Sequence, residues 1–162
     1  MTIKVGDKLP RATFMTMGPD GPKPRTTDEI FNGRKVVMFG LPGAFTPTCH
    51  RNHLPGYAAN AEAFKARGVD EIAVVSVNDV FVMDAWEKGT GSTGKVSFLA
   101  DGSADFARAT GLVLDLTAKG MGVRSQRYSM LVEDGVVTKL NLEDAPAGAE
   151  LSSGAEALLR QM

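Results

Sequence analysis

The chain has one cysteine, Cys49, and its neighbours favour chemistry at sulfur. It stands in the stretch Leu41-Pro-Gly-Ala-Phe-Thr-Pro-Thr-Cys-His50, which follows an apolar run. Pro47 favours the first turn of a helix, so Cys49 would lie where backbone N–H groups and the helix dipole stabilise an anion. The sequence therefore predicts a stabilised thiolate at Cys49, which is the nucleophilic form of cysteine.

Residues before Cys49 frame the predicted thiolate. Thr46 lies three residues earlier, and its hydroxyl is placed to bond the sulfur or a substrate. Pro42 and Pro47 stiffen the loop, remove two N–H donors and would restrict water around the sulfur. This loop is therefore the candidate site.

Both histidines of the chain also lie beside Cys49. His53 follows it by four residues and shares its helix face, so it either supports the helix by hydrogen bonding or pairs with the cysteine as in a hydrolase or acyltransferase. No Asn or Asp is clearly placed to orient His53, which argues against the hydrolase. His50 is expected to face solvent. Cys49 could instead be a buried small hydrophobe, or belong to a redox sensor or holdase that does not cycle.

A strand, a helix and a second strand must position this loop. The β-branched apolar run 35–41 predicts a strand buried on both faces. Apolar residues at helical spacing predict a helix over about 47–66, kinked at Pro55 and ended by Gly68. Residues 71–77 predict a second buried strand, which gives a right-handed parallel crossover with the loop at the carboxyl end of the first strand.

The rest of the chain predicts an α/β fold with a mixed central sheet flanked by helices, as a single domain over residues 1–162. The proline-rich segment 18–25 indicates a surface loop. The other expected elements are a short helix capped by Thr26 and Glu29, a helix capped by Asn78-Asp79 that runs through about Lys88, a strand over 96–100, a helix over 103–109, strands over 127–132 and 136–142 around Asp134-Gly135, and a final helix capped by Ser153 and Glu156 that ends at Arg160.

Composition excludes several functional classes. The 162 residues are 43% hydrophobic, enough for a core without disulfide support. Lys plus Arg number 18 against 19 Asp plus Glu, which argues against binding to nucleic acid or to a membrane surface. One cysteine and two histidines exclude an intrachain disulfide, a CxxC pair and a typical structural metal site. No apolar targeting or membrane segment is visible, so we expect a soluble, cytoplasmic protein.

The motif Pro42-x-x-x-Thr46-x-x-Cys49 resembles the PxxxTxxC signature of peroxiredoxins. The string over 42–49 is similar to their type II subgroup, also called type five. Further blocks follow in the order of that subgroup: His53-Leu-Pro-Gly56, Ser76-Val-Asn-Asp79, Leu99-Ala-Asp101, Gly122-Val-Arg-Ser125 and Arg127-Tyr-Ser-Met130. This resemblance covers nearly the whole chain and implies a thioredoxin-like fold and thiol peroxidase activity.

The resemblance also implies roles for individual residues. The peroxidatic cysteine corresponds to Cys49, whose thiolate would attack a peroxide oxygen, release water or an alcohol and become a sulfenic acid. Arg127 would hold the thiolate and polarise the peroxide. Thr46 and the N–H groups of Thr48 and Cys49 would hold the peroxide in line. Pro42 would shield the intermediate from water and further oxidation.

Four more residues are candidates around the same sulfur. Phe45, Leu116 and Met121 could line an apolar mouth beside the thiol, form a dimer contact or belong to the core. Arg124 could join the cluster of Arg127, although without the resemblance Arg127 itself would be read as a solvated residue at the edge of a strand.

Relatives of this subgroup often carry a second, resolving cysteine, which this chain lacks. Val74 stands at one of the two family positions and Leu151-Ser-Ser153 at the other. The chain thus resembles a one-cysteine enzyme for hydrogen peroxide and small organic hydroperoxides, reduced by glutathione, with or without glutaredoxin, or as a second choice by thioredoxin. The resemblance implies no metal, haem, flavin or nicotinamide cofactor, and it implies a homodimer.

Overall fold

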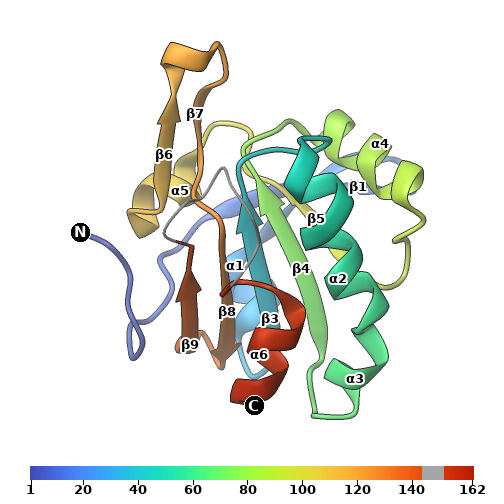
Figure 1. The fold of residues 1–162 in the computed structure, drawn as a ribbon, viewed down its shortest axis with the longest axis vertical. Coiled ribbons are helices and arrows are strands. Elements are labelled where there is room, and N and C mark those ends of the chain that lie inside the picture. The colour runs from blue at the N-terminus through green and yellow to red at the C-terminus, as the bar shows by residue number, and fades with distance from the viewer. Residues whose placement is uncertain (144–151) are drawn as a thin grey trace.

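A seven-stranded mixed sheet in the order β2-β1-β5-β4-β3-β8-β9 forms the middle of the protein (Figure 1). The computed structural model describes residues 1–143 and 152–162. The strands β3 (Lys35–Leu41), β4 (Glu71–Ser76) and β5 (Ser97–Ala100) form its parallel centre. Nearly all their residues are buried, as expected of parallel strands covered on both faces. The two predicted strands and their parallel crossover are confirmed.

Two hydrophobic cores lie on the two faces of the sheet. Val37, Phe39 and Leu41 of β3 belong to one core, whereas Val36 and Met38 belong to the other, because successive side chains of a strand point to opposite faces. The first core is covered by α2 (Leu54–Ala59), α3 (Ala61–Lys65), α4 (Val80–Thr90) and α6 (Ala155–Gln161), and the second by α1 (Thr27–Phe31) and α5 (Asp105–Thr110).

An antiparallel hairpin completes one side of the sheet. The strand β8 (Tyr128–Glu133) pairs with β3 and with β9 (Val136–Leu142). Asp134 and Gly135 join the two hairpin strands with φ angles of +49° and +77°. Asp-Gly favours such a turn, and the predicted hairpin is confirmed.

The opposite edge of the sheet corrects the sequence analysis. The segment 18–25, expected to be a loop, is largely part of a hairpin of β1 (Thr13–Gly18) and β2 (Gly21–Thr26). Pro22 and Pro24 are paired with residues of β1 in this hairpin. An edge strand bonds on one side only, so it tolerates prolines that a central strand would exclude.

The predicted helix over 47–66 begins at Pro47 but is divided. A π turn (Cys49–His53), in which the Leu54 N–H donates to the Cys49 carbonyl, is followed by α2 and α3. Pro55 has no N–H, and its ring excludes the ordinary bond to the carbonyl four residues before it. The irregularity expected at Pro55 therefore takes the form of a wider turn that carries Cys49 and His53.

Two further features were not expected. The strands β6 (Val113–Leu116) and β7 (Gly122–Ser125) form a separate two-stranded ribbon, which projects from the main sheet (Figure 1). Ser153 does not cap the last helix. The N-cap residue of α6 is Gly154, and no side chain caps the helix. Thr26 and Asp79, by contrast, cap α1 and α4 as predicted.

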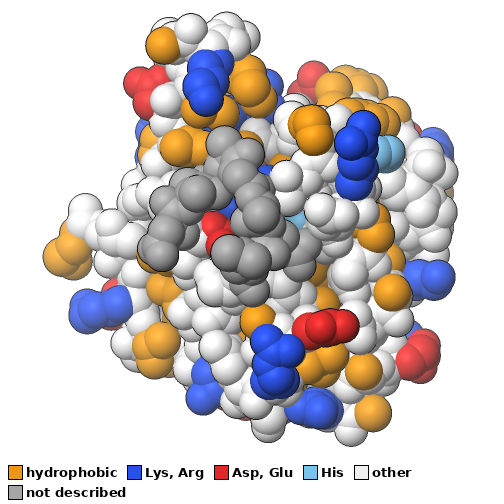
Figure 2. All heavy atoms as spheres, viewed as in Figure 1, with side chains coloured by type: hydrophobic (Ala, Val, Ile, Leu, Met, Phe, Trp, Pro, Cys, Tyr) orange, Lys and Arg blue, Asp and Glu red, His pale blue; other side chains and the backbone are white. Residues whose placement is uncertain are grey.

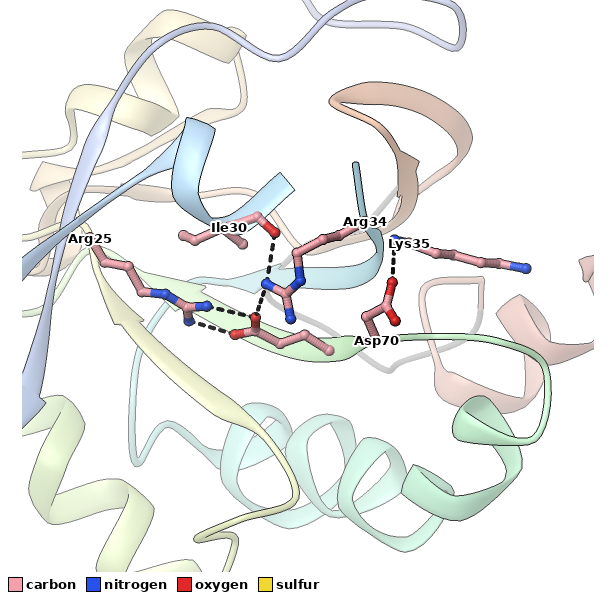
Figure 3. A network of polar contacts seen from close by, with 6 residues as sticks. Arg25, Ile30, Arg34, Lys35 and Asp70 are labelled. Atoms are coloured by element: carbon pink, nitrogen blue, oxygen red, sulfur yellow. Dashed lines mark hydrogen bonds and ion pairs between the residues drawn. The ribbon is translucent and has the colours of Figure 1, made fainter. Parts of the chain in front are cut away.

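An ion cluster fixes the end of the sheet opposite the Cys49 loop (Figure 3). Glu71, the first residue of β4, accepts two hydrogen bonds from Arg25, of 2.5 and 2.7 Å, and one of 2.7 Å from Arg34. Burial of the Glu71 carboxylate opposes its charge, but these hydrogen bonds outweigh burial and lower its pKa to about 2. The cluster ties β2 and the chain before β3 to β4.

Candidate active site

Cys49 is fully buried in the first turns of the helix that follows β3. The His50 N–H donates to the Thr46 carbonyl at 2.8 Å, so the helix starts after Thr46. Thr48 and Cys49 therefore lie in the first turn, whose N–H groups have no partner within the helix. The structure thus places the sulfur beside a helix start at the carboxyl end of a central strand, as the sequence predicts.

Arg127 brings a positive charge to the Cys49 sulfur. Its side chain is 2% exposed, and its Nη2 donates a hydrogen bond to the Cys49 Sγ at 3.1 Å. The residue directly precedes β8, and because β8 runs antiparallel to β3 it lies beside the end of β3. A guanidinium at this distance stabilises negative charge on the sulfur.

His53 holds the other side of the same guanidinium. The Arg127 Nη1 lies 3.1 Å from the His53 Nδ1, and the His53 Nε2 lies 3.0 Å from the Ser153 carbonyl. Because arginine only donates and a carbonyl only accepts, His53 must carry its proton on Nε2. Burial and the nearby Arg127 charge lower the His53 pKa to about 3, so the ring is neutral. Both ring nitrogens are engaged, which leaves neither for the cysteine–histidine pair of a hydrolase.

Thr46 and a cavity complete the surroundings of the sulfur. The Thr46 hydroxyl donates to the Gly43 carbonyl at 2.7 Å, so of the two expected partners, the sulfur or a substrate, its hydrogen is not given to the sulfur. Its oxygen retains acceptor capacity for an O–H group. A cavity of about 210 Å³ lies beside Thr46 and Arg127, whereas Cys49 itself is fully buried and does not line it. Its lining residues are Pro42, Thr46, Pro47, Thr48, Leu116, Lys119, Met121 and Arg127.

The apolar residues Leu116 and Met121 reach this cavity from the ribbon of β6 and β7. Leu116 ends β6, and Met121 precedes β7. Figure 2 shows hydrophobic side chains on this ribbon, which projects at the top of the view. The structure therefore brings two of the three expected apolar residues to the candidate site.

The third, Phe45, lies outside the cavity lining. Its side chain is 51% exposed and its φ of +64° is in the left-handed region. Its ring stacks on His50, with centroids 5.7 Å apart. His50 in turn accepts a hydrogen bond of 3.0 Å from the Trp86 Nε1, so the expectation that it faces solvent is wrong.

Arg124 contacts the active-site loop rather than the sulfur. Its Nε donates to the Met121 carbonyl at 2.9 Å and its Nη1 to the Pro42 carbonyl at 3.2 Å. A Cβ at Gly43 would lie 2.7 Å from the Arg124 Nη1, so a larger residue there would displace the end of the arginine side chain. Arg124 thus joins the β6–β7 ribbon to the loop.

Sequence reasoning missed several supporting residues. The Asn78 Oδ1 accepts from the Ala44 N–H at 3.0 Å and from the Ser76 hydroxyl at 2.6 Å, which fastens the loop to the end of β4. A polar residue directly after a central strand was the available signal. Ser153 contacts His53 and Glu143 contacts Ser153, and no local sequence pattern identifies either residue. Within residues 1–143 and 152–162, no three His, Cys, Asp or Glu side chains group as a metal site requires.

Comparison with known proteins decides the family. Residues 4–159 match the Redoxin family. The chain is 50% identical to Peroxiredoxin-2E-2, chloroplastic, of Oryza sativa subsp. japonica, over 99% of this chain and 73% of that protein. The chain belongs to the peroxiredoxin family. Its motifs are consistent with the type II subgroup.

Other peroxiredoxins agree in sequence and in fold. The chain is 44% identical to the hybrid peroxiredoxin hyPrx5 of Haemophilus influenzae, over all of this chain and 67% of that protein. The crystal structure of reduced Prx3 in complex with H2O2 from Vibrio vulnificus is 46% identical, with a TM-score of 0.93 over 99% of both chains. These matches confirm the thioredoxin-like fold, and the peroxiredoxin relatives support a thiol peroxidase activity.

The comparisons leave the cellular location open between compartments. Two similar relatives are named as chloroplastic, whereas others are bacterial. Within the described part of the chain, no helix combines the length and the apolar character needed to cross a membrane. The expected cytoplasmic location stays a prediction.

Proposed function

We propose that this peroxiredoxin is a one-cysteine peroxidase that reduces hydrogen peroxide and small organic hydroperoxides through a sulfenic acid on Cys49. The observation that carries this proposal is the buried contact of 3.1 Å between the Arg127 guanidinium and the Cys49 sulfur. It lies beside a cavity lined by Thr46 and Pro42. Positive charge at a buried sulfur favours the thiolate that the reaction needs.

The reaction balances without a cofactor. The Cys49 thiolate attacks one peroxide oxygen, an S–O bond forms and the O–O bond breaks. The second oxygen leaves with a proton as water or as an alcohol, and the sulfur, oxidised by two electrons, becomes a sulfenic acid. Arg127 stabilises the negative charge as it moves from the sulfur to the oxygens.

The other cavity residues orient the peroxide. Thr46, whose own hydrogen is used by Gly43, accepts the O–H hydrogen of the peroxide. The backbone N–H groups of Thr48 and Cys49 hold its oxygens in line with the sulfur. Pro42 limits water at the intermediate.

The remaining lining accounts for the range of substrates. The cavity of about 210 Å³ has room for hydrogen peroxide or a short alkyl hydroperoxide. The apolar side chains of Leu116 and Met121 favour an alkyl group over bulk water.

An outside thiol must complete the cycle, since Cys49 is the chain's one cysteine. A first thiol condenses with the sulfenic acid to a mixed disulfide and water, and a second thiol releases Cys49. We infer glutathione, with or without glutaredoxin, as the first choice of reductant and thioredoxin as the second. A cytoplasmic homodimer in antioxidant defence and redox homeostasis is the setting proposed from the family resemblance.

A comparison of reductants tests this function. Hydrogen peroxide consumption is measured with glutathione alone, with glutathione plus glutaredoxin, and with thioredoxin plus its reductase. We expect multiple turnovers with glutathione and glutaredoxin and none for Cys49→Ser. Turnover with thioredoxin but not with glutathione would identify thioredoxin as the reductant instead. A single turnover with every reductant would contradict a cycling peroxidase and favour a redox sensor.

A further inference from the structure

Behind the active site, a chain of buried hydrogen bonds links the carboxyl-terminal part of the protein to Arg127. Glu143, which follows β9, is 6% exposed, and its Oε1 accepts from the Ser152 N–H at 2.7 Å, the Ser153 N–H at 2.7 Å and the Ser153 hydroxyl at 2.9 Å. The Glu143 N–H also donates to the Arg127 carbonyl at 3.1 Å. One carboxylate thus fixes the backbone at Ser153 beside the residue that bears the catalytic charge.

The fixed Ser153 carbonyl then orients the His53 ring. It accepts from the His53 Nε2 at 3.0 Å and from the Tyr57 hydroxyl at 2.6 Å. The Ser153 hydroxyl gives its hydrogen to Glu143, so its 3.3 Å contact with Nε2 is one in which the imidazole donates. All these contacts require the proton on Nε2, which leaves the Nδ1 lone pair for Arg127.

We propose that Glu143 and Ser153 are positioning residues, which fix the Arg127 guanidinium against Cys49 by holding His53 in its Nε2–H tautomer. An arginine side chain has several rotatable bonds, and the His53 Nδ1 restrains Nη1 while Nη2 contacts the sulfur. Without the Ser153 carbonyl, the ring is free to turn or to move its proton to Nδ1, and an Nδ1–H opposes the arginine. This inference rests on the proposed function of Arg127.

Two substitutions at Glu143 distinguish the effect of its hydrogen bonds on the position of Ser153 from the effect of its negative charge. Glu143→Ala leaves three donors without their acceptor, two of them on the buried Ser153, so Ser153 shifts and Arg127 loses its support. Glu143→Gln removes the charge but offers an amide oxygen to the same donors. Asp101→Ala is the matched control, because Asp101 is also buried and accepts from backbone N–H groups, those of Phe106 and Ala107, at the start of α5.

Alkylation of Cys49 by iodoacetamide across pH supplies a readout that needs no peroxide. We expect its midpoint pH to rise in Glu143→Ala and to stay at the wild-type value in Glu143→Gln and in Asp101→Ala. The reaction with peroxide should slow about 10- to 100-fold in Glu143→Ala alone, as for a displaced catalytic group. A wild-type profile for folded Glu143→Ala, or an equal shift in Glu143→Gln, would overturn the proposal. If the wild-type protein does not react with peroxide but the alkylation midpoints shift as stated, the proposed peroxidase function is contradicted and the positioning role is not.

Nitrogen NMR of the wild-type imidazoles tests the His53 tautomer that the proposal requires, even if Glu143→Ala does not fold. Long-range proton–nitrogen correlations at pH 7 distinguish a protonated from an unprotonated ring nitrogen, and a His50→Gln variant assigns the two histidines. We expect His53 to be neutral with its proton on Nε2. A proton on Nδ1, or on both nitrogens, would overturn the proposal.

Discussion

At the scale of single residues, the Cys49 sulfur depends on one guanidinium that also contacts the His53 ring. The Arg127 Nη2 contacts the sulfur and its Nη1 contacts the His53 ring, each at 3.1 Å. Only a rigid fork of donors can satisfy both at once, because a lysine ammonium is a single point on a flexible chain. The positive charge alone is therefore insufficient.

Substitution of Arg127 by lysine tests this dependence on shape. We expect Arg127→Lys to slow the reaction with hydrogen peroxide about 100-fold, as when one preorganised donor is lost. Stopped-flow fluorescence of Trp86 measures the rate, since Trp86 is bonded to His50 beside the sulfur. Arg124→Lys, at an arginine that contacts carbonyls only, should cause a clearly smaller decrease. Equal decreases would contradict the special role of Arg127.

The neutral His53 predicts how stability depends on pH. Burial and Arg127 lower the His53 pKa from 6.5 to about 3, so between these values the unfolded chain binds a proton that the folded chain does not. Stability is therefore fully present above pH 6.5 and decreases as the pH falls, by about 2 kcal/mol between pH 7.5 and 5. Urea unfolding at both pH values measures it. His53→Gln should flatten this dependence, and an unchanged slope would show that another group causes it.

The local part of the site was predictable from sequence, and its distant part was not. Thr46, Pro42 and Cys49 lie within eight residues, so strand, loop and helix signals fix their mutual placement. Ser153 contacts His53, which lies 100 positions earlier, and Glu143 acts on His53 through Ser153, so these contacts depend on the tertiary fold rather than on local pattern. Only the family resemblance indicated Arg127 in advance.

At the scale of elements, the ends of the central strands have separate tasks. The carboxyl end of β3 carries the active-site loop, and the amino end of β4 carries Glu71 with its two arginines (Figure 3). The same strands that place the sulfur are thus fastened at the other end by charge.

Removal of the Glu71 carboxylate should destabilise the fold without changing chemistry at Cys49. We expect Glu71→Ala to lower the free energy of unfolding by about 2 kcal/mol, less than for a fully buried pair because Arg25 and Arg34 are 25% and 32% exposed. Urea unfolding measures it. Asp28→Ala, which breaks an exposed pair, should change stability by less than about 0.5 kcal/mol. An equal effect of both substitutions would contradict a stabilising role for the ion cluster at Glu71.

The elements that sequence analysis identified are those with strong local signals. β3 and β4 are β-branched and apolar, and Thr26 and Asp79 cap helices as predicted. The strand β2 escaped detection because its prolines indicate a loop, yet an edge position tolerates them. The π turn at Cys49 escaped because hydrophobic spacing reports a helix but not the width of its turns.

At the scale of the whole molecule, the sheet brings distant segments to one sulfur. β8 runs antiparallel to β3 with Tyr128 opposite Gly40, so Arg127 lies where the Cys49 loop begins. The β6–β7 ribbon adds one wall of the cavity, and the segment before α6 supports His53 from behind. The site as a whole therefore needs residues from both halves of the chain.

Because the chain has a single cysteine, the two steps of the proposed cycle are carried out by different molecules. The protein supplies the peroxide step, and a separate thiol supplies the reducing step, because no second cysteine exists in the chain. The net charge of −1 offers no broad electrostatic field to select that thiol.

The central claim is that the buried setting of Cys49 accelerates its reaction with peroxide. The most direct test mixes reduced protein with hydrogen peroxide and follows Trp86 fluorescence, with mass spectrometry to confirm one added oxygen on Cys49. We predict a second-order rate constant roughly 1,000-fold or more above that of free cysteine at the same pH. A rate constant no higher than that of free cysteine would contradict the account.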